Sequence, residues 1–136
     1  MEARDIMTKD VITLSPDMSV EEATDVLLRY RIHGAPVTTP EGQLLGMVSF
    51  MDLARRAGED ARVEDIMTPD PVVAQEDTPV EEIARLMLDQ MVRRIPIVRA
   101  GKVVGIVSAS DIVQLFLNLH EAPRPRGPER AARTGR

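Results

Sequence analysis

The chain of 136 residues contains one pattern twice, and this duplication limits its possible folds more than any other feature. The tetrad Asp5-Ile6-Met7-Thr8 recurs 60 residues later as Asp65-Ile66-Met67-Thr68. Further along, Gly46-Met47-Val48-Ser49 matches Gly105-Ile106-Val107-Ser108 at an offset of 59 residues, which indicates a one-residue change in an intervening turn. A unit of ~50–55 residues is marginal for independent folding, so the two units are expected to share one buried interface.

The first part of each unit predicts a short turn with the tetrad, then a strand, then a helix. Strands are expected at 11–14 and 72–74, where β-prone residues cluster. The first helix begins after Ser19, because Glu22 three residues later completes a capping-box pattern. In the second unit Thr78 has the same pattern, and Pro79 is expected as the first helical residue.

The second part of each unit predicts a hairpin of two strands followed by another helix. The hairpins are expected at 35–48 and 95–107, each around a glycine-containing turn. The fold class is therefore α/β (α+β), with two β-α-β-β-α repeats packed with pseudo-two-fold symmetry. The expected division is a first repeat at 1–60, a second repeat at 61–120 and a disordered tail at 121–136, which is rich in arginine and proline.

Charge and composition argue against several classes of partner. The tail carries a net +3, so residues 1–120 carry −8 of the total of −5, and an acidic body is not typical of a nucleic-acid-binding protein. No run approaches ~18 apolar residues, and the first residues lack the order of a signal peptide. The sequence therefore predicts a cytoplasmic protein without membrane insertion, and the arginines of the tail are interpreted as a solvated end.

Catalysis and metal binding find little support in the sequence. Cysteine is absent, which removes thiolate chemistry, and His33 and His120 are the only histidines. No nucleophile motif, phosphate loop or cluster of histidines and carboxylates at ligand spacing is present. The chain is therefore not expected to be an enzyme or to hold a metal.

The candidate chemistry lies where a strand meets a helix start. Ser49 and Asp52, like Ser108 and Asp111, form a Ser-x-x-Asp pattern directly after a strand. One interpretation is helix capping alone, because this spacing satisfies the first free N–H groups of a helix. The other is a ligand site, in which the same groups bind phosphate or sugar oxygens. The duplication of the pattern favours two equivalent clefts between the units.

Cations are unequally distributed between the two units. Arg93 and Arg94 precede the strand of Pro96 and are suited to bidentate contacts with phosphate. The matching positions of the first unit hold His33 and Gly34. Pairing with surface carboxylates is the alternative for the two arginines, and it contributes little stability.

The tetrads, the strands around Pro36 and Pro96 and the doubled Ser-x-x-Asp pattern resemble a pair of CBS (cystathionine-β-synthase) domains, a Bateman module. The resemblance covers roughly residues 5–118. It implies a regulatory module that binds AMP, ADP, ATP or S-adenosylmethionine between the repeats, with Asp52 and Asp111 holding ribose. The resemblance also implies a homodimer formed through helices, for which Leu115, Phe116 and Leu119 are candidates, although the same residues suit a buried core.

Sites in this family combine residues of both repeats. By the resemblance, one cleft would contain Ser49, Asp52, Thr78, Val92, Arg93, Arg94 and Pro96. The opposite cleft would contain Ser108, Asp111, Met18, Ile32, His33, Gly34 and Pro36. Met18 and Gly34 replace a hydroxyl and a cation in the second set, so the Ser49 cleft is expected to bind phosphate more tightly.

Two functions remain open from the sequence. The preferred one is a module that senses an adenosine-containing ligand and transmits binding to an unidentified regulated protein as a conformational or dimer change. The alternative is a scaffold for dimerisation or partner docking that binds no ligand, in which the motifs only cap helices.

Overall fold

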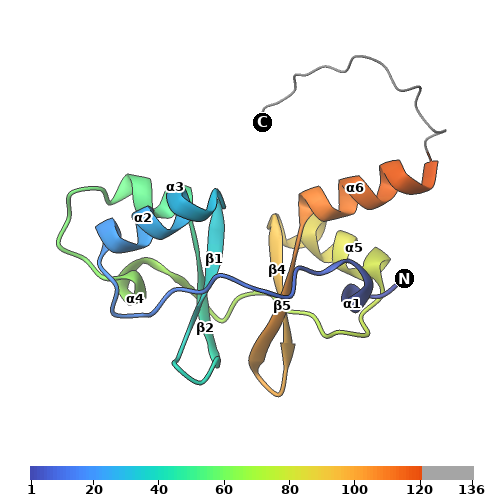
Figure 1. The fold of residues 1–136 in the computed structure, drawn as a ribbon, viewed down its shortest axis with the longest axis horizontal. Helices are drawn as coiled ribbons and strands as arrows, with labels where there is room; N and C mark the ends of the chain where they lie inside the picture. Colours follow the sequence, from blue (N-terminus) through green and yellow to red (C-terminus); the bar gives the residue numbers. More distant parts are fainter. Residues whose placement is uncertain (121–136) are drawn as a thin grey trace, which may run out of the picture.

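The duplicated sequence folds into two similar halves that lie side by side (Figure 1). The computed structural model describes residues 1–120, so the tail predicted at 121–136 lies outside the described residues. Three short elements are α1 (Ala3–Ile6), α4 (Val63–Ile66) and β3 (Thr68–Pro69). The first half is built from α2 (Val20–Tyr30), β1 (Gly34–Thr38), β2 (Leu44–Ser49) and α3 (Phe50–Arg55). The second half repeats this order with α5 (Val80–Gln90), β4 (Arg94–Arg99), β5 (Lys102–Ser108) and α6 (Ala109–His120).

The two predicted hairpins are confirmed. Strand β1 pairs antiparallel with β2, and β4 pairs antiparallel with β5, each with a register shift at the same point of the repeat. The turns of the hairpins also join the halves: the Leu44 N–H donates to the Gly101 carbonyl (3.0 Å), and the Val103 N–H donates to the Gly42 carbonyl (3.1 Å). Figure 1 shows the hairpins facing each other, with the longer helices on the outer sides.

The long helices begin and end largely as the sequence predicts. The Ser19 hydroxyl accepts from the Glu22 N–H (3.0 Å), and the Glu22 carboxylate accepts from the Ser19 N–H (2.9 Å). Helices α2 and α5 each bury one apolar face and end at a left-handed residue, Arg31 or Met91, both at φ 56°. This conformation closes a helix and turns the chain toward the next strand.

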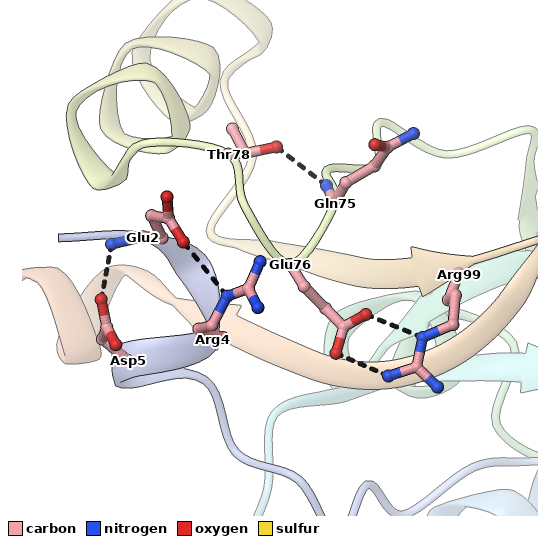
Figure 2. A network of polar contacts seen from close by, with 7 residues as sticks. All are labelled: Glu2, Arg4, Asp5, Gln75, Glu76, Thr78 and Arg99. Carbon is pink, nitrogen blue, oxygen red and sulfur yellow. Dashed lines mark hydrogen bonds and ion pairs between the residues drawn. The ribbon is translucent and has the colours of Figure 1, made fainter.

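The predicted cap of α5 is wrong. Helix α5 begins at Val80 with Pro79 as its cap, and no side chain caps it. The Thr78 hydroxyl instead accepts from the Gln75 N–H (2.9 Å), as Figure 2 shows, so it closes the preceding turn. The Thr78 carbonyl accepts from the Ala3 N–H (2.9 Å), which places this residue in a contact between distant segments.

The first predicted strand of each repeat is reduced to one bridging residue. Leu14 forms an isolated parallel bridge with Val37, and Ala74 forms the matching bridge with Ile97. The residues before each bridge form no ladder with the neighbouring hairpin strand. The prediction of strands at 11–14 and 72–74 was therefore wrong in extent.

The short segment that leads into each tetrad packs in the core of the half formed by the other repeat. Ala3 is fully buried in the core of the second half, and Val63 is fully buried in the core of the first. Each segment forms a short helix where the sequence predicted a turn, because the Asp5 and Asp65 carboxylates accept from the N–H groups that open α1 and α4 (2.8 and 3.0 Å). The two short helices, α1 and α4, thus tie the halves together.

A polar network fixes the start of the chain against the second half (Figure 2). The Arg4 N–H donates to the Glu76 carbonyl (2.9 Å), and the Arg4 side chain pairs with Glu2 (3.1 Å). The Arg99 guanidinium donates two hydrogen bonds of 2.8 Å to the Glu76 carboxylate. These bonds lower the pKa of Glu76 and raise the pKa of Arg99. Arg99 is therefore a paired surface arginine, unlike its neighbours at the start of β4.

Candidate functional site

The loop before β1 or β4 is held against the helix that follows the hairpin. The His33 carbonyl accepts from the Phe50 N–H (2.7 Å) at the start of α3. The Arg93 carbonyl accepts from the Ala109 N–H (2.8 Å) at the start of α6. Each half therefore places its Ser-x-x-Asp pattern beside the residues that precede its own first hairpin strand.

Both Ser-x-x-Asp patterns cap their helices, as one interpretation of the sequence requires. The Ser49 N–H donates to Asp52 Oδ2 (2.9 Å), and the Asp52 N–H donates to the Ser49 hydroxyl (3.1 Å). The corresponding distances for Ser108 and Asp111 are 2.8 and 3.2 Å. Capping uses one oxygen of each carboxylate and one lone pair of each hydroxyl. The hydroxyl proton and Oδ1 are left for other partners.

The two aspartates differ in how their remaining oxygen is used. Asp52 Oδ1 lies 3.7 Å from the Arg55 guanidinium, one turn further along α3. Asp111 forms no ion pair with another residue of the described part of the chain. Asp111 is therefore the carboxylate with greater capacity to accept hydrogen bonds from a ligand.

A cavity of about 820 Å³ lies at the junction of the two halves. We call it the arginine cavity. Its lining comes from four segments: the extended segment after α1, the loop before β1 with the start of α3, the start of β4, and the end of β5 with the start of α6. The lining residues are Thr8, Asp10, Val11, Ile12, Arg31, Ile32, His33, Gly34, Ser49, Phe50, Met51, Arg93, Arg94, Ile106, Ser108, Ala109, Ser110 and Asp111.

Arg94 reaches from the second half onto the first. A methyl group at Gly34 would lie 2.9 Å from Nη1 of Arg94, so the guanidinium occupies the space that a side chain at this position would need. The matching residues of the repeats thus meet across the junction, and only one of them carries a side chain. Glycine here permits the close approach of a cation to the backbone.

The charge of Arg94 is poorly compensated by the protein. Burial, with a smaller effect of the neighbouring Arg93 charge, lowers the pKa of Arg94 from its ordinary value. Neither Arg93 nor Arg94 forms an ion pair with a carboxylate among residues 1–120. A half-buried guanidinium without a counter-charge is suited to an anionic ligand, because bidentate hydrogen bonds to phosphate would restore both its charge balance and its lost hydration.

The structure brings together part of the predicted site. Ser49, Arg93 and Arg94 of one predicted cleft line the arginine cavity together with Ser108, Asp111, Ile32, His33 and Gly34 of the other. Asp52, Thr78, Val92, Pro36, Pro96 and Met18 lie outside this lining. Pro36 and Pro96 are buried within their strands, where they support the hairpins.

Sequence reasoning missed the extended segment at Thr8–Ile12, which forms one wall of the cavity. The backbone N–H groups of Val11 and Ile12 donate to no other described residue, so they are available to a ligand. A signal was present in the sequence, because β-prone residues that directly follow a tetrad occur in both units. Interpreting them as a paired strand hid this role.

Comparison with known proteins places the chain in a family. A sequence model of the CBS domain matches residues 3–59 and again residues 63–118, so the chain belongs to the CBS domain family and carries two copies of the domain. It is similar to inosine-5'-monophosphate dehydrogenase of Methanocaldococcus jannaschii, with 39% identity over 113 residues, which are 82% of this chain and 23% of the relative. The first curated relatives that it matches are longer proteins, of which the chain spans 23% to 42%.

Solved structures of CBS domain pairs share the fold. One is the CBS domain pair of protein MJ0100 in complex with 5-methylthioadenosine and S-adenosyl-L-methionine, with a TM-score of 0.82 and 31% identity over 88% of this chain and 98% of that chain. Another is CBSX2, a CBS-pair protein of Arabidopsis thaliana, in complex with AMP, with a TM-score of 0.81 and 32% identity over 87% of this chain and 97% of that chain. In residues 1–120, no helix has the length and apolar character needed to cross a bilayer.

Proposed function

We propose that the chain is a regulatory module that binds a phosphate-bearing adenine nucleotide in the arginine cavity. The observation that carries this proposal is the pair Arg93 and Arg94, which line the cavity without an ion-pair partner among the described residues. A volume of about 820 Å³ is of the size that small-molecule sites have. The complexes of similar CBS pairs with AMP and with S-adenosyl-L-methionine support an adenosine-containing ligand.

The residues at the junction divide the recognition of such a ligand between them. Arg93 and Arg94 would bind the phosphate, since guanidinium groups form bidentate hydrogen bonds to phosphate oxygens. Asp111 Oδ1 would accept from ribose hydroxyls, and the Ser108 hydroxyl would donate to the ligand. The free backbone groups of Val11 and Ile12 would hold the base at the opposite wall. In this assignment AMP, ADP and ATP are preferred over S-adenosylmethionine, which carries a sulfonium cation and no phosphate.

Calorimetric titration with AMP, ADP, ATP and S-adenosylmethionine tests the proposal. We expect saturable binding of at least one phosphate-bearing nucleotide and weaker binding of S-adenosylmethionine. A ligand at 100 times its dissociation constant adds about 2.7 kcal/mol to the free energy of unfolding, so the thermal midpoint should rise. If none of the four compounds bound at millimolar concentration, the scaffold function, in which the chain docks a partner without a ligand, would replace this proposal.

The aspartates provide a sharper version of the same test. Asp111→Ala is expected to weaken nucleotide binding more than Asp52→Ala does, because Asp111 lines the cavity and Asp52 is outside it beside Arg55. This order reverses the ranking made from the sequence. The two variants are matched, since each removes one carboxylate from a capping box. An effect that is larger for Asp52→Ala would move the proposed site to the other cleft.

The proposal includes a homodimer that contacts its partner through α6. Val113, Phe116 and Leu119 on this helix expose 57%, 58% and 64% of their surface, whereas Leu115 is half-buried. Phe116→Glu is expected to shift the mass measured by sedimentation equilibrium from dimer to monomer, because a charge would then face an apolar interface. Asn118→Glu, an exposed position on the same helix, is the control. A parent chain that sediments as a monomer would contradict this part of the proposal.

The remaining assignments follow from the same proposal. The chain would act by binding rather than by catalysis, in the cytoplasm, and an unidentified protein would respond to its ligand state. The division at residue 60 into two repeats also stays a prediction.

A further inference from the structure

A second and smaller cavity, of about 290 Å³, lies beside the first hairpin. We call it the hydroxyl cavity, because four hydroxyl side chains and one lysine contribute its polar lining. The lining residues are Lys9, Val11, Thr13, Leu14, Ser15, Thr38, Thr39, Pro40, Gly42 and Val103. Lys9 and Thr13 of the extended segment line this cavity, Asp10 and Ile12 line the arginine cavity, and Val11 between them lines both. The alternation of the other four residues is that of an extended chain, whose successive side chains point to opposite sides.

Thr38 is the most informative residue of the hydroxyl cavity. Its exposed fraction is 6%, and among residues 1–120 it is the only polar residue that is buried. Its backbone N–H donates to the Leu14 carbonyl (2.9 Å), but its hydroxyl makes no hydrogen bond to another described residue. A buried hydroxyl without a partner carries an unfavourable desolvation cost, which a ligand that accepts its proton would remove.

The duplication of the chain shows that the fold does not require these polar groups. At the matching positions of the second repeat, Val73 replaces Thr13 and Val98 replaces Thr38. Pro69 stands for Lys9. Valine and threonine have nearly the same shape, and β1 and β4 each pair with the following strand in the same register, with Thr38 in one and Val98 in the other. The hydroxyl groups of Thr13 and Thr38 are therefore not required by the segments that carry them.

We propose that the hydroxyl cavity is a second binding site, separate from the arginine cavity, for a small tetrahedral oxyanion such as inorganic phosphate. Lys9 forms no ion pair with a described carboxylate and would supply the positive charge. The hydroxyls of Thr13, Ser15 and Thr38 would donate hydrogen bonds to the anion oxygens. The volume of about 290 Å³ has room for an anion of this size. The polar groups that would hold the anion are not those of the arginine cavity, so the site does not depend on the function proposed there.

Titration with inorganic phosphate, followed by backbone amide NMR at constant ionic strength, tests the site. We expect saturable shifts at Thr38, Thr39 and Gly42. Thr38→Val is expected to weaken binding about 3- to 10-fold, as the loss of one hydrogen bond does, and Lys9→Met about 10-fold or more. Val98→Thr, which adds a hydroxyl at the matching position of the other repeat, is the control and should leave the affinity unchanged.

The variants are expected to fold, because Thr38→Val installs the residue that the second repeat already has. Without phosphate its thermal midpoint should equal or exceed that of the parent chain, since a buried hydroxyl without a partner is removed. Shifts confined to Gly34 and Ala109 would place phosphate in the arginine cavity alone and overturn the proposal. Equal affinity in the parent and Thr38→Val chains would overturn it as well. AMP binding is measured at the arginine cavity. If AMP did not bind there, phosphate binding at the hydroxyl cavity could still be measured and interpreted.

Discussion

Arg94→Ala is expected to weaken AMP binding by about 10- to 100-fold and to leave the affinity for adenosine nearly unchanged. A hydrogen bond between charged groups contributes about 1.5–3 kcal/mol, and about 1.4 kcal/mol corresponds to a factor of ten. The effect belongs at the upper end of this range because Arg94 is half-buried and has no ion-pair partner in the described chain. Calorimetry with AMP and with adenosine measures the phosphate contribution directly.

Arg99→Ala provides a matched control on the same strand. Arg99 is exposed and pairs with Glu76 at 2.8 Å, and it lies outside the lining of the arginine cavity. Its replacement should leave both affinities unchanged. If Arg94→Ala weakened AMP and adenosine binding equally, the guanidinium would be supporting the fold of the junction rather than binding phosphate.

Gly34→Ala tests the same contact from the other side. The added methyl group would lie 2.9 Å from Nη1 of Arg94 and 3.0 Å from the Val48 carbonyl oxygen, so the guanidinium must shift. A loss of AMP affinity in this variant, without loss of charge, would show that the position of Arg94 matters as well as its charge.

The local elements of this fold could be predicted because each depends on neighbouring residues. The apolar faces of α2 and α5 repeat every three to four residues, and the Ser19 and Glu22 pair marks one helix start. The hairpins follow from β-prone runs around a short turn. Local reasoning failed at α5 because two local interactions compete for one group: the Thr78 hydroxyl accepts from the Gln75 N–H (2.9 Å) and closes the preceding turn instead of capping the helix.

The candidate site was predictable in its residue types but not in its arrangement. The Ser-x-x-Asp patterns and Arg93 and Arg94 are visible in the sequence. Arg94 meets Gly34 across the junction, and no spacing in the sequence reveals this contact between residues of different halves. The pairing of Asp52 with Arg55, by contrast, has a spacing of three residues on one helix, which the sequence does show.

The packing of α1 in the core of the second half leads to the largest expected effect on stability. Ala3 lies near the start of the chain, yet it is fully buried in the core cluster that contains Ile83, Ile95 and Ile97. Ala3→Asp is therefore expected to destabilise the protein by about 3–5 kcal/mol, as an uncompensated buried charge does. Since small proteins have only about 5–15 kcal/mol of stability in total, this change is large. Urea unfolding followed by circular dichroism measures it.

Arg4→Ala is the control for this variant, since Arg4 is exposed and its ion pair with Glu2 should contribute less than about 1 kcal/mol. Hydrogen exchange locates the damage: amides of Ile97 and Val107 in the second half should lose protection before those of Val37 and Val48 in the first. Equal loss in both halves would contradict the assignment of α1 to the second core.

The pH dependence of the Ala3→Asp chain separates a buried charge from simple overpacking. Burial would raise the pKa of the introduced carboxyl above its unfolded value, so the folded state would bind the proton more tightly than the unfolded state. The stability difference from the parent chain should then be smallest below the unfolded pKa of about 4 and should grow as pH rises through the folded pKa. A difference that is constant with pH would indicate that steric crowding alone destabilises the variant.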